Sequence, residues 1–403
     1  MGRRADSIAT SVTVSVTMSG VGASTNYVVV TPSGVVYVVF IDGNTDVSFV
    51  KSSDGGLTWS DHTVVFAGTV NNLAVWYDRW SGISADLIHL AYTETIGSDT
   101  LYRTIDAASA DALSTQTTIF AGASAVASGS SLSITRARGG NVYCRTCIDA
   151  GAEGGFFRLP NANVPNGAWD AARTINEALA TLDQIILVPG FAADNQDIMA
   201  MFWDASANEV SRQIYDDSAN SWAETSIAGT MVEHSGSGTL WPDFNAAVDL
   251  ENSRIVLVAW SATDTLNADL RCWTITESAI TETATNVVLN SGGNQGMCGV
   301  SIHTGRTGVW KVAYCGKSDG TEVIIAGGAT LCNVYFKETF DSGATWGSEQ
   351  LMTTYVRDID CLLVNPRATD GKLTVSYRVD GASDQMFCNV DHVLPRAALL
   401  LGV

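Results

Sequence analysis

The chain has 403 residues, of which 46% are hydrophobic and 16% charged, and this composition predicts a packed core and excludes a disordered chain. Its 22 basic and 42 acidic residues give a formal charge of −20, which repels phosphate backbones and argues against nucleic-acid binding. No apolar run is long enough to predict membrane insertion.

The first predicted element is an alternating strand over residues 10–19, with Val12, Val14, Val16 and Met18 on one face. The residues before it contain two arginines, but no long apolar run follows them. This N-terminus is therefore a poor signal peptide.

Seven segments with one shared pattern follow in chain order. Each has β-branched or aromatic residues at period two, and they end at Phe40, Tyr92, Thr146, Trp203, Trp260, Tyr314 and Tyr377. Subtracting successive residue numbers gives intervals of 52, 54, 57, 57, 54 and 63 residues. Such regular spacing predicts one strand of a repeating unit.

One further predicted strand precedes each copy and up to two follow it, which gives four antiparallel strands per repeat, as in a β-propeller blade. We therefore predict an all-β, seven-bladed β-propeller, with six blades as the alternative. Residues 1–390 form the single domain, in which strand 10–19 completes the last blade and closes the ring. The apolar tail, 391–403, is predicted to pack on the propeller or to dock on a neighbour.

Two turns carry the same residues at the same offsets. The first set is Ser52, Asp54, Gly56, Thr58 and Trp59, and the second is Thr339, Asp341, Gly343, Thr345 and Trp346. Both match the Asp-box, S/T-x-D-x-G-x-T-W, and the chain resembles the sialidase-like superfamily of Asp-box (BNR-repeat) β-propeller proteins. TIDAASADAL, NANVPNGAW and YDDSANSW look like eroded copies.

We expect the box to be structural, because its carboxylate can accept hydrogen bonds from the N–H groups of its own turn while glycine adopts positive φ. The box turn joins the third and fourth strands. The resemblance places function on the opposite face of the propeller.

The same resemblance defines what a sialidase site would need, namely an arginine cluster, an acid/base aspartate and a tyrosine–glutamate pair. Two of the arginines are missing, since Asn26-Tyr27-Val28 and IDGNTD stand at their positions. Asp46 matches the acid/base, Glu233 is a candidate partner acid, and Arg271 or Arg378 matches a later arginine. A sialidase-like glycoside hydrolase is therefore the alternative function, and the sequence leans against an enzyme.

The loops on the functional face are acidic, and they form either a candidate calcium site or a docking surface for a basic partner. The plainer interpretation is that an acid-rich chain places acids in every loop. Trp76, Tyr77, Trp80 and Trp241 are glycan-binding candidates, because exposed aromatic rings can stack on sugars. The alternative for each is packing between blades.

The eight cysteines are scattered, and Cys144 and Cys147 would face opposite sides of one strand, so we expect small buried side chains and not a metal site.

Overall, we predict a non-catalytic propeller of a bacteriophage virion, acting in structure or in receptor or glycan binding at the tail, neck or capsid surface. Its partners are other virion proteins, further copies of itself or a cell-surface glycan. A secreted, extracellular lectin or assembly factor is the other alternative.

Overall fold

Each of the repeated segments forms the second strand of an antiparallel sheet in the computed structural model of the protein. The structure describes residues 26–77, 86–94, 99–122, 131–146, 155–177, 183–204, 206–229, 244–264, 267–288, 296–303, 305–316, 333–352, 359–368, 372–379 and 385–391. The predicted strand 10–19 and the tail from 392 onward lie outside these residues.

The first four sheets follow the chain in order. They contain β1 (Asn26–Val30), β2 (Val36–Ile41), β3 (Val47–Ser52) and β4 (Thr63–Phe66); β5 (Val70–Tyr77), β6 (Leu87–Glu94), β7 (Thr100–Asp106), β8 (Ala112–Leu113) and β9 (Thr117–Phe120); β10 (Ser133–Arg136), β11 (Val142–Arg145) and β12 (Phe156–Leu159); and β13 (Gln184–Pro189), β14 (Ile198–Asp204), β15 (Glu209–Asp216) and β16 (Ser221–Ala228).

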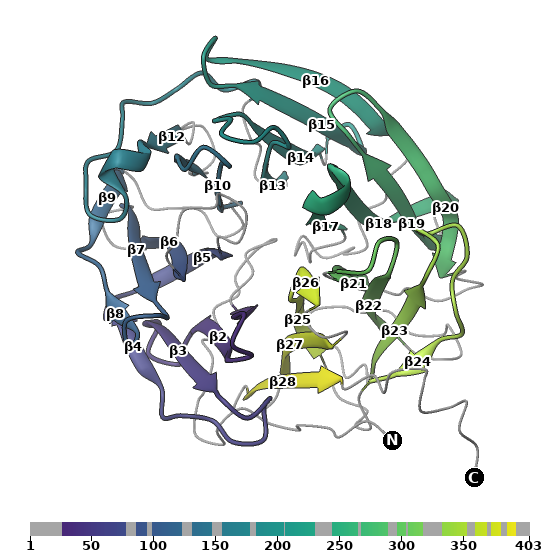
Figure 1. The fold of residues 1–403 in the computed structure, drawn as a ribbon, viewed down its shortest axis with the longest axis horizontal. Coiled ribbons are helices and arrows are strands. Elements are labelled where there is room, and N and C mark those ends of the chain that lie inside the picture. Colours follow the sequence, from purple (N-terminus) through teal and green to yellow (C-terminus); the bar gives the residue numbers. More distant parts are fainter. Residues whose placement is uncertain are drawn as a thin grey trace.

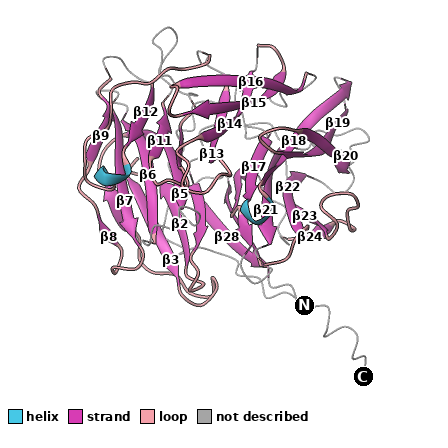
Figure 2. Cartoon of the chain, turned by 45° about the horizontal axis from the view of Figure 1, so that its top comes forward, coloured by secondary structure: helices cyan, strands magenta, loops and turns pink. Residues whose placement is uncertain are grey.

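The later sheets repeat this plan with one departure. They contain β17 (Phe244–Asp249), β18 (Arg254–Asp264), β19 (Asn267–Ile275) and β20 (Ile280–Val288); β21 (Gly296–His303), β22 (Trp310–Gly316), β23 (Asn333–Thr339), β24 (Gln350–Leu351) and β26 (Arg367–Ala368); and β25 (Ile359–Val364), β27 (Leu373–Val379) and β28 (Gln385–Asp391). In Figure 1 the sheets stand around a central axis, with β16 and β20 on the rim, and Figure 2 shows the same ring tilted.

The all-β propeller with antiparallel blades is confirmed, and two short 3₁₀ turns, η1 (Asn161–Asn163) and η2 (Leu250–Asn252), are the helical segments of the described chain. The departure is β26, which pairs in parallel with β21 of the preceding sheet. The last sheet has three described strands and is tied to its neighbour in this way, so the prediction of seven separate four-stranded blades is not confirmed. Closure by residues 10–19 stays a prediction.

The core lies between neighbouring sheets. All six residues of β2 are buried, because the sheet is covered on both faces, and this explains why the repeated segments read as nearly continuous apolar runs. Cys388 of β28 packs among valines of the first sheet, so the last sheet lies against the first. Five cysteines are buried in the described structure, as expected, and burial raises the pKa of Cys272 to about 12. No described helix is long and apolar enough to cross a membrane.

Candidate functional site

The inner strands of the ring run side by side around a channel. The Ser131 and Ser133 hydroxyls accept hydrogen bonds from the backbone N–H groups of Ile185 (3.0 Å) and Leu187 (2.9 Å). Both bonds join residues 54 positions apart, so β10 and β13 run parallel and in register. On the other side of the ring the Asn245 amide oxygen accepts from the N–H of Val300 at 3.3 Å.

The channel encloses a cavity of about 170 Å³, lined by residues of β1, β5, β10, β13, β17 and the segment from β25 to β26. Its wall is mainly valine, isoleucine and leucine. Polar and aromatic side chains interrupt this apolar wall, and they are Tyr27, Trp76, Tyr77, Ser131, Ser133, Gln184, Phe244, Asn245, Asn365 and Arg367. A concave apolar site with a few polar groups is the usual form of a ligand pocket.

Two of the predicted glycan-binding residues, Trp76 and Tyr77, are adjacent in this wall. The half-buried Trp76 packs against two core clusters, one formed by β5–β12 and the other by β13–β19, so its indole spans from its own sheet toward the far side of the ring. The Tyr77 hydroxyl donates to the Asp86 carboxylate at 2.9 Å. Trp80 and Trp241 lie outside the described residues.

The aromatic pair marks one mouth of the channel. Tyr77 pairs with Ile88 next to the turn between first and second strands, and in an antiparallel blade this turn lies on the same face as the box turns. Asn365 and Arg367 follow the inner strand β25 on that face as well. We define Trp76, Tyr77, Asn365 and Arg367 as the box-face mouth. This is the face that the resemblance did not favour for function.

The first box turn makes the bonds expected of a structural motif. The Asp54 carboxylate accepts from the backbone N–H and hydroxyl of Thr58 (2.9 and 2.7 Å) and from the Ser52 hydroxyl (2.7 Å), and Ser52 in turn accepts from the N–H of Gly56. The bonds from Thr58 and then Ser52 lower the pKa of Asp54 to about 2. Gly56 has a φ of 90°, and Trp59 packs on the first sheet.

The second box turn repeats this arrangement. Asp341 accepts from the backbone N–H of Thr345 (2.8 Å), from the Thr345 hydroxyl (2.5 Å) and from the Thr339 hydroxyl (2.8 Å), and these bonds lower its pKa. Gly343 has a φ of 84°. Trp346 packs against the core between β17–β20 and β21–β23. Neither box aspartate faces the channel wall.

The residues proposed for a glycosidase do not line the channel in the described structure. Asp46 lies in the turn between β2 and β3 and accepts from the backbone N–H of Gly68 at 2.8 Å. Arg271 lies on the third strand of another sheet and binds Glu282 of its own sheet at 2.5 Å. Glu233 lies outside the described residues, and for Arg378 the structure describes the backbone pairing of β27 alone.

The acidic loops form no metal site among the described residues, since no group of three His, Cys, Asp or Glu side chains there converges. Several of these carboxylates accept hydrogen bonds from groups of their own turns. Asp42 accepts from the backbone N–H groups of Asn44 and Asp46 and from the Ser48 hydroxyl. Asp204 accepts from Ser206 and Ala207 in the same manner.

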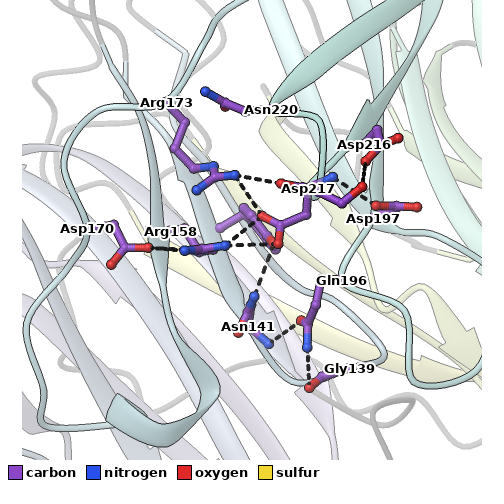
Figure 3. Close-up of polar contacts among 12 residues, drawn as sticks. Gly139, Asn141, Arg158, Asp170, Arg173, Gln196, Asp197, Asp216, Asp217 and Asn220 are labelled. Carbon is purple, nitrogen blue, oxygen red and sulfur yellow. Dashed lines mark hydrogen bonds and ion pairs between the residues drawn. The ribbon is translucent and has the colours of Figure 1, made fainter.

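A polar cluster between the third and fourth sheets was not predicted from the sequence (Figure 3). The Asp217 carboxylate lies between two guanidinium groups, those of Arg158 (2.9 Å) and Arg173 (3.1 Å). Arg158 also binds Asp170 at 2.6 Å, and the backbone N–H of Asp217 donates to Asp197 at 2.8 Å. The cluster joins two sheets and is fully bonded, so we interpret it as an interblade clamp.

The sequence did carry a signal for this clamp. Asp217 stands five residues before Trp222, the same offset that separates Asp54 from Trp59. In YDDSANSW the turn is instead capped by Asp216, which accepts from Ser218 and Ala219. This releases Asp217 to bind the neighbouring sheet.

The sequence matches no protein-family model and no curated protein. Among solved structures, an ulvan lyase of a polysaccharide lyase family termed PL25 aligns at a TM-score of 0.57 with 8% identity, over 97% of this chain and 98% of its own. A triple arginine mutant of AofleA from Arthrobotrys oligospora aligns at 0.50 with 14% identity, over 82% and 88%. The phage phi92 endosialidase reaches 0.49 with 10% identity, over 98% and 69%. At such identities the likeness to the lyase and to AofleA shows a shared fold and no more.

Proposed function

We propose that the protein is a non-catalytic, glycan-binding propeller that holds a terminal sugar at the box-face mouth of its channel. The observation that carries this proposal is the placement of Trp76 and Tyr77 in the same wall as Asn365 and Arg367. Aromatic rings suit the C–H faces of a sugar, and an amide with a guanidinium suits its hydroxyl or carboxylate oxygens.

The size of the cavity limits what can enter. At about 170 Å³ it is smaller than the roughly 300–1,000 Å³ typical of small-molecule sites, so it suits one sugar residue at a chain end and not a threaded polysaccharide. Solved structures that share the fold include an ulvan lyase bound to -[GlcA(1-4)Rha3S]-, which aligns at a TM-score of 0.56 with 8% identity, over 95% of this chain and 98% of its own. This supports a carbohydrate ligand by analogy of fold only.

Binding without turnover is favoured because no described carboxylate pair faces the channel wall. A glycoside hydrolase of the usual kind needs two carboxyl groups across the scissile bond, about 5–10 Å apart. Of the described candidates, Asp46 accepts a hydrogen bond from the backbone N–H of Gly68, and Arg271 forms an ion pair with Glu282. Neither residue lines the channel.

A glycan array tests this function. We expect saturable binding of at least one glycan, no released sugar, and a loss of affinity of about tenfold or more in Arg367→Ala, which corresponds to about 1.4 kcal/mol. Arg306→Ala is the matched control, because Arg306 is an exposed arginine in the turn between β21 and β22, on the same face but outside the channel. Release of product, or equal binding by both variants, would contradict the proposal.

We further propose that the propeller works on the surface of a bacteriophage particle, where a receptor-binding glycan site would be used. The support is the sequence, whose two Asp-box turns resemble those of a superfamily that mostly acts outside cells. Mass spectrometry of purified particles is expected to detect this chain at a fixed copy number. Its recovery only from culture medium, free of particles, would favour the secreted lectin or assembly factor.

A further inference from the structure

A second hollow lies at the rim of the propeller, among outer strands, whereas the channel lies among the inner strands. It has a volume of about 490 Å³ and is bounded by residues 282–287 of the outer strand β20 and by Lys337, Ala344 and Trp346 of the next sheet. In Figure 1 β20 and β23 lie next to each other on the outside of the ring. We call this hollow the rim groove. Its volume falls within the range of roughly 300–1,000 Å³ typical of ligand sites.

The second box turn forms one wall of the rim groove. Gly343 of this turn is packed so closely that an added Cβ atom would lie 2.9 Å from the Thr283 hydroxyl of β20 and 2.9 Å from the Trp310 ring. This close contact fixes the turn against β20. Trp346, at the end of the box, is half-buried, and its indole N–H has no acceptor among the described residues.

The floor of the groove offers free hydrogen-bonding groups. Thr285 and Asn286 are exposed on β20, and their side chains make no hydrogen bond to any described residue. Thr283 differs, because its hydroxyl donates to the Cys272 carbonyl at 3.2 Å. The side chains open to a ligand are thus a hydroxyl and an amide.

Lys337 supplies the charge at the back of the groove. Its half-buried ammonium donates to the Val287 carbonyl at 2.8 Å, and no described carboxylate lies within ion-pair distance. Glu349 is near, but its carboxylate accepts from the Tyr314 hydroxyl, and Glu282 on the groove wall is bound by Arg271. An ammonium has three N–H donors, so two of them remain for a ligand.

We propose that the rim groove binds a sugar residue that carries a carboxylate. Lys337 pairs with the carboxylate, the exposed part of the Trp346 indole packs on the sugar ring, and Thr285 and Asn286 bond to its hydroxyls. The formal charge of −20 repels long polyanions, so a single acidic unit or a short acidic glycan fits better than an acidic polymer. This site is separate from the channel and does not depend on the function proposed for it.

Indole N–H resonances provide a site-specific test. In protein labelled with ¹⁵N-tryptophan, eleven indole signals are expected, and Trp346→Phe identifies the signal of the groove. Titration with glucuronate should shift that signal, and Lys337→Met should weaken the binding at least tenfold, because it keeps the aliphatic stem and removes the charge. Glucose, which lacks the carboxylate, should bind the wild type and Lys337→Met equally.

Two controls separate the sites. Lys372→Met removes a lysine in the turn before β27 and should leave the glucuronate titration unchanged. Arg367→Ala, in the channel, should also leave the Trp346 signal responsive, which keeps this test independent of the channel. The proposal is overturned if glucuronate fails to shift the Trp346 signal, or if Lys337→Met binds glucuronate as tightly as the wild type does.

Discussion

Replacing Asp217 by alanine should lower the free energy of unfolding by about 3 kcal/mol. The substitution removes the carboxylate that the guanidinium groups of Arg158 and Arg173 share. The side chain of Arg158 is 24% exposed and that of Arg173 is 14% exposed. Removing one partner of a buried ion pair typically costs about 3–5 kcal/mol, and the partial exposure here places the effect at the lower end. Urea unfolding followed by tryptophan fluorescence measures the change.

The neighbouring residue supplies the control for this experiment. Asp216 is exposed and accepts only from groups of its own turn, Ser218 and Ala219. Asp216→Ala should therefore lower the free energy of unfolding much less than Asp217→Ala does, because it removes bonds within a single exposed turn. If the two variants lose the same stability, Asp217 is a turn residue and the interblade clamp contributes nothing.

Acidification below about pH 6.5 should destabilise the protein through His89. This side chain is completely buried in β6, its Nδ1 atom lies 2.7 Å from the Tyr102 hydroxyl, and its Nε2 atom has no partner among the described residues. Burial, and secondly the charge of Arg136, holds the pKa of His89 well below its ordinary value of 6.5.

The sign of the effect follows from proton binding. Below pH 6.5 the unfolded chain gains a proton at His89 while the folded protein does not, so the free energy of unfolding falls as the pH falls. The slope approaches about 1.4 kcal/mol per pH unit until the folded pKa is reached. Stability measured at pH 7 and pH 5 in wild type and His89→Phe isolates this contribution, which should be missing in the variant.

His62, which is exposed, is the matched histidine for this experiment, and His62→Ala should keep the pH dependence of the wild type. A wild-type pH profile in His89→Phe would show that other groups cause the acid sensitivity. If His89→Phe does not fold, His89→Asn preserves a hydrogen bond to Tyr102 and removes the titrating ring.

The second strands of the sheets could be predicted from the sequence because a strand covered on both faces is apolar throughout, and β2 shows this at all six positions. The bonds of the box turns were equally accessible, since Asp54 and Thr58 lie within one turn. These features depend on neighbours in the chain. A pattern of residue types is enough to reveal them.

The features that escaped prediction depend on contacts between distant segments. The pairing of β26 with β21 joins Arg367 to Ile302, and no local pattern indicates it. The channel mouth was predicted in part, because Trp76 and Tyr77 were chosen from the sequence as glycan-binding candidates. Arg367 was not predicted, because only the three-dimensional arrangement of the sheets brings it into the same wall. The rim groove depends on two sheets meeting at Lys337 and β20, which sequence spacing does not define.

The inner strands carry a constraint on how such a chain can change. Ser131, Ser133 and Asn245 each place an acceptor opposite a backbone N–H of the next sheet, at separations of 54, 54 and 55 residues. An insertion of one residue in an inner strand would move that acceptor to the opposite face and leave a donor unsatisfied on the channel side. Length variation should therefore accumulate in the loops, and a gene duplication that adds a blade must copy a whole period, with its acceptor, to be tolerated.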